Sequence, residues 1–534
     1  MHSGRYLSST GEAPDVAAGW TLDAVIGPSA LFGANGMKVG PDGRLYVAQA
    51  FGSQVSALDC ETGAPETVVP VGSAVVAPDD LAFDTRGVMY ITEVMSERVS
   101  ARLPDGTLRV VASDVPVANG ITAYGDRIFM DEFRPDGRIL ELYPDGRAPR
   151  VIAEHLALPN ALARGPDDCL YFPQVLNGEI WRVPVAGGAP EIVLGGLALP
   201  TAVKFSPRGE LFTVEAGSGE ITRIDPVART RHVIAHVRPG IDNFAFTPDG
   251  RLFVSHFTDG GVAEILPDGR ERVLVAAGLL GPFGIACAPD GTLHVADGMS
   301  LAVVHAGRVT ARPALLVNHE FPGFARAVAV AGDHCFIATS AGTVARMRAG
   351  AETVTLATSL AQPTGLAIAA DGRVLVCERD AGRVLAITPE GRVTELARGL
   401  HAPTGIAVAA DGGCFVSEAT GGRVVHVANG EVSEVIGGLQ EPHGVACSNG
   451  EVCVLDRAGR TVSRRTADGV CDIIVSNLPV GAAPGVVPKA LPGIAGVMPG
   501  PLLPFADLAV APDGALLIGA DGAGAVLALR HGAR

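Results

Sequence analysis

Residues 241–256 read IDNFAFTPDGRLFVSH, and variants of this phrase recur along the whole chain. Each copy places one short apolar segment before a tight turn and another after it, and the pair Asp249-Gly250 suits a hairpin because such turns need positive φ. The copies align on the residue at the position of Asp249: Asp42, Arg86, Asp126, Asp167, Arg208, Asp249, Asp290, Asp333, Asp371, Asp411, Asn449 and Asp513. Successive turns lie 38–44 residues apart, except for a last interval of 64. A period of about 40 residues with several short strands per unit is typical of a β-propeller.

The repeat predicts an all-β fold of two consecutive six-bladed β-propellers, with twelve four-stranded blades in total. A strand at 20–26 precedes the first unit, and we expect it to complete the sixth blade. A similar strand at 271–276 is then expected to complete the twelfth blade, so that each ring is closed by its own first strand and no sheet edge stays open. The predicted domains are 1–269 and 270–534, with a Pro/Gly-rich insert at 479–505 in the second.

The composition narrows the classes of partner. A net charge of −16 disfavours nucleic acid and anionic membranes, which need basic patches. No secretory h-region is evident in residues 1–20, no stretch is apolar enough to cross a bilayer, and the nine cysteines include no C-x-x-C pair, so we expect a reducing, cytoplasmic setting. Arginine carries most of the positive charge, and the near absence of lysine (Lys38, Lys204 and Lys489) is interpreted as compositional bias.

A set of polar residues occupies one position of the repeat, seven residues before the turn. Residues at one position of a circular repeat converge on one place, here one mouth of the central tunnel. In the first half that position holds oxygen donors suited to Ca²⁺ or another divalent cation: Asn35, Asp79, Asn119, Asn160 and Asp242. Thr201 is the sixth member. The second half has Phe283, Arg326, Thr364, Thr404 and His443 there, so the turn does not itself require Asn or Asp.

A second layer comes about seven residues after each turn, at the end of the second strand. It contains Gln49, Glu93, Glu132 (or its neighbour Asp131), Gln174, Glu215 and His256. We predict that His256, Asp242 and Glu215 supply catalytic groups and that Gln49, Glu93, Glu132, Gln174 and Thr201 contact substrate. A purely structural role stays open for the acids, because the second half also has them at this position, as Asp297, Glu378, Glu418 and Asp456.

The first half resembles the SMP-30/gluconolactonase and paraoxonase-like group of six-bladed propellers, through residues 117–130 (VANGITAYGDRIFM), 158–172 (LPNALARGPDDCLYF) and 241–256. The resemblance implies a divalent cation, commonly calcium, in the tunnel mouth and hydrolysis of lactones or esters. Asn119 and Asn160 match the paired Asn ligands of that group, and Asp242-Asn243 matches its Asp-Asn pair. Two positions depart from its pattern: Asn35 replaces a Glu, and Thr201 stands where an Asp is frequent.

The second half, in residues 363–387 (PTGLAIAADGRVLVCERDAGRVLAI), resembles NHL-type repeats, which implies a platform for a protein partner. The leading hypothesis is a calcium-dependent hydrolase of a small-molecule lactone or ester, with its active site in the first propeller. One alternative is an interaction scaffold whose ion is structural. Another is a metal-dependent lyase of the virginiamycin B lyase type, for which His443 keeps the second ring a candidate.

Overall fold

The computed structural model describes residues 13–298, 300–311, 323–348, 350–481 and 505–532. These residues form twelve antiparallel sheets, eleven of four strands and one of five, which confirms the all-β class and the twelve blades. They divide into two compact units. The first ring comprises 29–277, and the second ring joins the described residues up to 28 to those from 278 onward. No helix in the described ranges is long and apolar enough to cross a membrane.

The first ring contains six blades in chain order. Its strands are β3 (Met37–Val39), β4 (Leu45–Gln49), β5 (Gln54–Leu58), β6 (Pro65–Val69), β7 (Pro78–Phe83), β8 (Met89–Glu93), β9 (Arg98–Arg102), β10 (Leu108–Ser113), β11 (Ala118–Tyr124), β12 (Arg127–Glu132), β13 (Pro135–Leu142), β14 (Arg150–Ala157), β15 (Ala163–Arg164), β16 (Cys169–Gln174), β17 (Glu179–Pro184), β18 (Glu191–Leu194), β19 (Pro200–Phe205), β20 (Leu211–Glu215), β21 (Glu220–Asp225), β22 (Thr230–His236), β23 (Ile241–Phe246), β24 (Leu252–His256), β25 (Val262–Ile265) and β26 (Glu271–Val275). A single turn of 3-10 helix, Val175–Asn177, interrupts the fourth blade.

The second ring also has six blades. Its strands are β1 (Asp15–Val16), β2 (Trp20–Ile26), β27 (Pro282–Cys287), β28 (Leu293–Asp297), β29 (Ser300–His305), β30 (Arg308–Ala311), β31 (Ala325–Ala331), β32 (His334–Thr339), β33 (Val344–Arg348), β34 (Val354–Ala357), β35 (Pro363–Ile368), β36 (Val374–Glu378), β37 (Arg383–Ile387), β38 (Val393–Arg398), β39 (Pro403–Val408), β40 (Cys414–Glu418), β41 (Arg423–Ala428), β42 (Glu431–Ile436), β43 (Pro442–Ser448), β44 (Glu451–Asp456), β45 (Thr461–Arg465), β46 (Cys471–Ser476), β47 (Leu508–Val510), β48 (Leu516–Ala520) and β49 (Ala525–His531).

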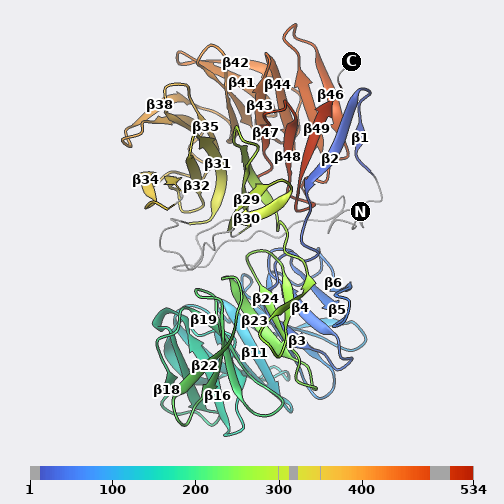
Figure 1. The fold of residues 1–534 in the computed structure, drawn as a ribbon, viewed down its shortest axis with the longest axis vertical. Helices are drawn as coiled ribbons and strands as arrows, with labels where there is room; N and C mark the ends of the chain where they lie inside the picture. The colour runs from blue at the N-terminus through green and yellow to red at the C-terminus, as the bar shows by residue number, and fades with distance from the viewer. Residues whose placement is uncertain (1–12, 299, 312–322, 349, 482–504, 533–534) are drawn as a thin grey trace. The chain divides into compact units, whose positions relative to one another are not determined.

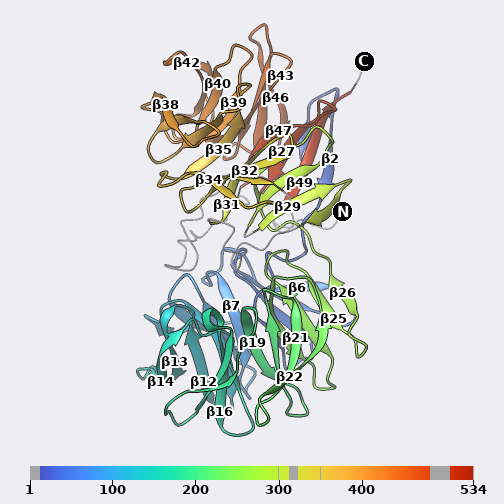
Figure 2. The ribbon, with the colours of Figure 1, turned by 60° about the vertical axis from the view of Figure 1, so that its left-hand side comes forward.

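The blades of each ring are arranged in a closed circle, with the inner strands nearest its axis (Figures 1 and 2). In the first ring the inner strands contact one another in the cyclic order β3, β7, β11, β15, β19, β23 and back to β3. In the second ring the order is β27, β31, β35, β39, β43, β47 and back to β27. Neighbouring sheets share apolar cores; Tyr90 of β8 and Met130 of β12 belong to one such cluster and are fully buried. Both faces of a central strand are therefore covered, and every residue of β8 is buried.

The predicted assignment of the two outer strands was wrong. β26 directly follows β25 through a turn in which Leu266 N bonds to Arg270 O, and it completes the sixth blade. β2 pairs with β49 and completes the twelfth blade, so the amino-terminal strand closes the second ring. The first ring therefore extends to Ala277 and excludes residues up to Pro28, in contrast to the predicted division at 269. Of the predicted insert at 479–505, residues 482–504 lie outside the described ranges.

Candidate site in the tunnel of the first ring

The six residues predicted to share one tunnel mouth all lie at the start of an inner strand. Asp79, Asn119, Thr201 and Asp242 are the second residues of β7, β11, β19 and β23, and Asn35 and Asn160 come just before β3 and β15. At these starts the pairing with the second strand is irregular, between Pro78 and Leu81 in one blade and between Ile241 and Phe244 in another. Such bulges re-aim side chains and are frequent beside functional sites.

Two carboxyl groups at this mouth have raised pKa values. Asp79 and Asp242 keep some exposed surface. Desolvation by the tunnel wall, and then repulsion from Asp242, raises the pKa of Asp79 well above its usual range. Desolvation, with further repulsion from Asp80, raises the pKa of Asp242 to about 7, although the Lys204 ammonium acts in the opposite direction. Acids whose pKa is raised by desolvation and by neighbouring charges are frequent at functional sites.

Asp80 and Asp131 add two further carboxyls next to the mouth. Asp80 Oδ2 accepts a hydrogen bond from Ile121 N (3.2 Å) and Oδ1 accepts one from Asn243 Nδ2 (3.4 Å), so its side chain connects the third and sixth blades. A Cβ added to Gly36 would lie 2.3 Å from Asp80 Oδ1, which explains the glycine there. Asp131 accepts from Gly120 N, while its Oδ2 is buried and has no partner among the described residues. Of the two candidates in the third blade, Asp131 therefore offers a carboxyl oxygen without a partner among the described residues, whereas Glu132 is paired with arginines.

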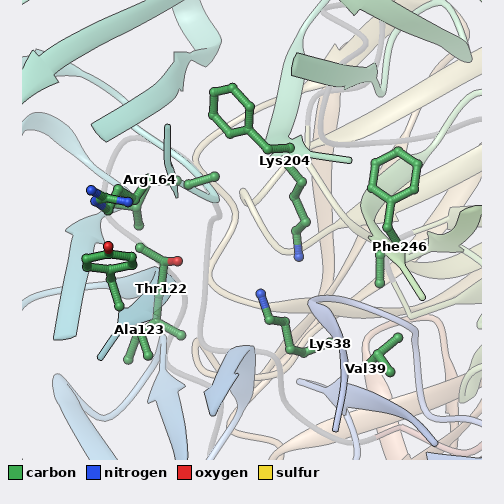
Figure 3. Close-up of a pocket in the computed structure, with 13 residues that line it drawn as sticks. Lys38, Val39, Thr122, Ala123, Arg164, Lys204 and Phe246 are labelled. Carbon is green, nitrogen blue, oxygen red and sulfur yellow. The ribbon is translucent and has the colours of Figure 1, made fainter. Parts of the chain in front are cut away.

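Two lysines, for which the sequence predicted no functional role, lie in the same tunnel. Lys38 on β3 and Lys204 on β19 point their ammonium groups toward one another (Figure 3). Burial lowers the pKa of both amines, that of Lys204 to about 8, and attraction to Asp80 partly offsets this. The interpretation of lysine scarcity as compositional bias did not predict this placement, which brings two of the three lysines into one tunnel. Their scarcity was the signal that could have revealed them.

The donor set fits a divalent cation. Asn119 Oδ1 is buried and unpartnered within the described ranges. Asn35 Oδ1 and Asn160 Oδ1 each accept one backbone N–H, from Ala50 and Ala161, and a carbonyl oxygen has a second lone pair to offer. Four acids against two lysines leave two negative charges when all are ionised. No three His, Cys, Asp or Glu side chains of the described residues form a metal site, so a cation would need the carboxamides as well.

The second layer has a structural role. Its members accept hydrogen bonds from the backbone of the loop that enters the same blade: Gln49 from Phe32 N (2.8 Å), Glu93 from Val76 N (2.7 Å), Gln174 from Ala157 N (2.7 Å) and Glu215 from Ala198 N (2.6 Å). Glu132 instead pairs with Arg134 and Arg138. The acids of the second ring make the same loop contacts, for example Glu418 with His401 N (2.7 Å). These backbone contacts engage the second-layer side chains within the ring, and the substrate contacts predicted for this layer and the catalytic role predicted for Glu215 stay predictions.

This contact predicts a large stability effect for Glu93→Ala. The substitution removes the acceptor of Val76 N–H and Ser100 Oγ–H, and each buried donor left unsatisfied costs about 1–3 kcal/mol. Denaturant unfolding should therefore show a clear decrease in the free energy of unfolding. Glu66→Ala is the matched control, because Glu66 is an exposed partner of Arg44 and should cost less than about 1 kcal/mol. Equal stabilities of the two variants would contradict this role.

The His256 side chain is enclosed, and the Thr201 side chain makes a contact between blades. The His256 imidazole is fully buried, and neither ring nitrogen has a hydrogen-bond partner in the described part of the chain. Desolvation, aided by the Arg238 charge, lowers its pKa to about 3, so it is not the predicted base with a pKa near neutrality. Thr201 Oγ1 donates to Ile241 O of the next blade, as Thr404 Oγ1 does to Pro442 O in the second ring. Its hydroxyl thus joins two blades.

The equivalent mouth of the second ring has different chemistry. Arg326 is buried and lies over the Phe283 ring, 3.8 Å from its centroid, with Nε and Nη1 unpartnered among the described residues. His443 Nδ1 accepts from Ala506 N (3.3 Å), its ring stacks on Phe505, and burial lowers its pKa. Its Nε2 lies 3.5 Å from Glu441 Oε1, so both ring nitrogens of His443 are engaged, and lyase chemistry in this ring stays a prediction.

Asp507 is the second-ring counterpart of Asp80, and it predicts a pH-dependent stability. Its Oδ2 accepts from Ile285 N (3.2 Å), and burial raises its pKa to about 7. Because the folded-state pKa lies above the unfolded value, ionisation favours unfolding, and stability should fall as pH rises from about 4 to 7. Asp507→Asn should reduce this slope in thermal unfolding scans across that range. An unchanged slope would show that the carboxyl is ionised at no cost in the folded protein.

Comparison with known proteins is consistent with a propeller enzyme class. The model of the virginiamycin B lyase family matches residues 191–463, slightly more than half of the chain. The chain belongs to this family. The matched stretch begins in the fourth blade and ends in the eleventh, so it covers parts of both rings and assigns the active site to neither.

Individual relatives are distant. A gluconolactonase from Zymomonas mobilis subsp. mobilis is 28% identical over 185 residues, which cover 32% of this chain and 45% of that protein. The chain thus spans less than half the length of this curated relative. The streptogramin B lyase structure matches with 19% identity and a TM-score of 0.39, covering 52% of this chain and 95% of that one. A gluconolactonase from Xanthomonas campestris matches with 17% identity and a TM-score of 0.38, covering 46% and 92%.

Proposed function

We propose that the first ring is a divalent-cation-dependent hydrolase of a small lactone or ester. The observation that carries the proposal is the pair of carboxyl groups with raised pKa values, Asp79 and Asp242, at a mouth that also contains the Asn119 Oδ1, which has no partner among the described residues. Calcium is the cation we expect, because the donors are all oxygens, several of them neutral. The gluconolactonase relative supports a lactone as the substrate class.

In this proposal Asp79, Asp242 and the carboxamide oxygens of Asn35, Asn119 and Asn160 would hold the cation. When bound, it supplies positive charge that polarises a substrate carbonyl and stabilises the oxyanion formed by attack of water. Of the three predicted catalytic groups, Asp242 keeps some exposed surface and has a raised pKa, and we assign it the role of accepting the proton of the attacking water. The Lys204 ammonium favours its ionised form.

A metal-dependent elimination is the second candidate, and membership of the virginiamycin B lyase family favours it. A carboxylate base near a polarised carbonyl can remove a proton from carbon as well as from water. The two reactions differ in their products. Hydrolysis adds one water to the substrate, whereas elimination cleaves it without adding any.

The test combines metal content with product mass. The purified full-length protein is dialysed against chelator, reloaded with Ca²⁺, Mg²⁺, Mn²⁺ or Zn²⁺, and assayed on aldonolactones, alkyl lactones and aryl esters in H₂¹⁸O. We expect turnover only after reloading, with one ¹⁸O in each product molecule. Turnover by the chelated protein would overturn the cation requirement, and product without ¹⁸O would support elimination instead.

A further inference from the structure

The tunnel of the first ring contains a cavity of about 230 Å³ at the end away from the Asn/Asp mouth. Its walls come from the later residues of the inner strands. Lys38, Thr122 and Lys204 lie three positions after Asn35, Asn119 and Thr201, a distance of roughly 10 Å along a strand. The cavity is therefore a site separate from the proposed cation site.

The charged groups in this cavity are mainly cationic. Lys204 Nζ donates to Met37 O (2.8 Å), whereas Lys38 Nζ makes no hydrogen bond or ion pair within the described ranges. The Arg164 guanidinium lies 3.5 Å from the centroid of the Tyr124 ring and pairs with Asp168 at the rim. Figure 3 shows the two ammonium groups facing each other across the open space.

The nearby acid does not neutralise both lysines. Asp80 attracts each of them, but its two oxygens already accept hydrogen bonds from Ile121 N and Asn243 Nδ2. Asp242 acts on Lys204 alone and belongs to the opposite mouth. Like charges that face each other in a desolvated space repel unless an anion lies between them.

We propose that this cavity binds a small organic carboxylate between the ammonium groups of Lys38 and Lys204. Thr122 lines the cavity and carries a hydroxyl, and Phe246 and Tyr124 line it with aromatic rings that can pack against a carbon skeleton. The cavity volume of about 230 Å³ suits a small acid. The apolar wall favours an organic acid over inorganic phosphate, which has no carbon skeleton to pack there.

The test is a binding measurement that involves no catalysis, so its failure is distinguishable from failure of the proposed hydrolase. Isothermal titration of the full-length protein at pH 6.5 and constant ionic strength uses lactate, succinate and gluconate as probes, with inorganic phosphate and neutral glucose for comparison. We expect the carboxylates to bind, and Lys38→Met and Lys204→Met each to weaken binding by at least tenfold. Arg270→Met removes an exposed charge elsewhere in the ring and should change nothing.

Three outcomes would overturn the proposal. No carboxylate binds, a variant that combines Lys38→Met with Lys204→Met binds a carboxylate as well as the unchanged protein, or phosphate binds better than every carboxylate. If the variants do not fold, the unchanged protein still decides the matter. Because the chain has only three lysines, their acetylation by a mild amine-reactive reagent can be followed at each one by mass spectrometry. Succinate should slow modification of Lys38 and Lys204 and leave that of Lys489 unaltered; equal rates with and without succinate would reject the site.

Discussion

Asp242→Asn is expected to abolish nearly all turnover in the first ring while leaving the fold intact. Asparagine keeps the shape of the side chain and one oxygen, but it removes the negative charge and the group that accepts the proton. Loss of a positioned base alone lowers a rate by about 10²–10⁴-fold, and weaker cation binding should add to this. The measurement is kcat/KM on the best lactone or ester, together with the bound metal by elemental analysis.

Two controls make this expectation specific. Asp79→Asn should also lose bound cation, because Asp79 belongs to the same pair of carboxylates. Asp507→Asn replaces a buried acid of similarly raised pKa in the tunnel of the second ring and should keep full activity. If Asp242→Asn turned over substrate as fast as the unchanged protein, the active site would have to be placed elsewhere.

Removal of residues 1–26 is expected to destabilise the second ring and spare the first. The deletion takes away β2, whose Leu22 packs into the core of the twelfth blade and whose Ile26 is buried against β27–β29. Loss of a large buried aliphatic side chain costs about 2–5 kcal/mol, and this deletion removes the buried Ile26 together with the partly buried Leu22 and Val25. Since 1 kcal/mol corresponds to roughly 2–4 °C for a domain of this size, one thermal transition should fall by 10 °C or more.

Calorimetry of the full chain and the deletion measures this directly, and activity identifies the ring that is spared. A point variant gives a milder version: Leu22→Asp should lower the same transition, whereas Thr21→Asp, at its exposed neighbour on β2, should not. A deletion that lowered the transition linked to catalytic activity would mean that β2 stabilises the first ring, as the sequence analysis had expected.

The sequence was sufficient for the fold class, the number of blades and the common position of Asn35, Asp79, Asn119, Asn160, Thr201 and Asp242. These features depend on local chemistry: turn residues that need positive φ, alternating apolar strands, and a period of about 40 residues that repeats them in one register. The same local reasoning left Asp131 and Glu132 as alternatives, because either side chain could face the tunnel until the pairing of β12 was known.

Contacts between residues far apart in the sequence decided which strand closes each ring, and they also decided the hydrogen bonds and pKa values of the site side chains. Residues 20–26 and 271–275 have similar strand patterns, and no local feature distinguishes which ring each one completes. Ala198 N, 17 residues before Glu215, donates a hydrogen bond to its carboxylate, and burial lowers the pKa of His256. Lys38 and Lys204 are 166 positions apart in the sequence and share a cavity only because a circular sheet arrangement brings the first and fifth blades to a common axis.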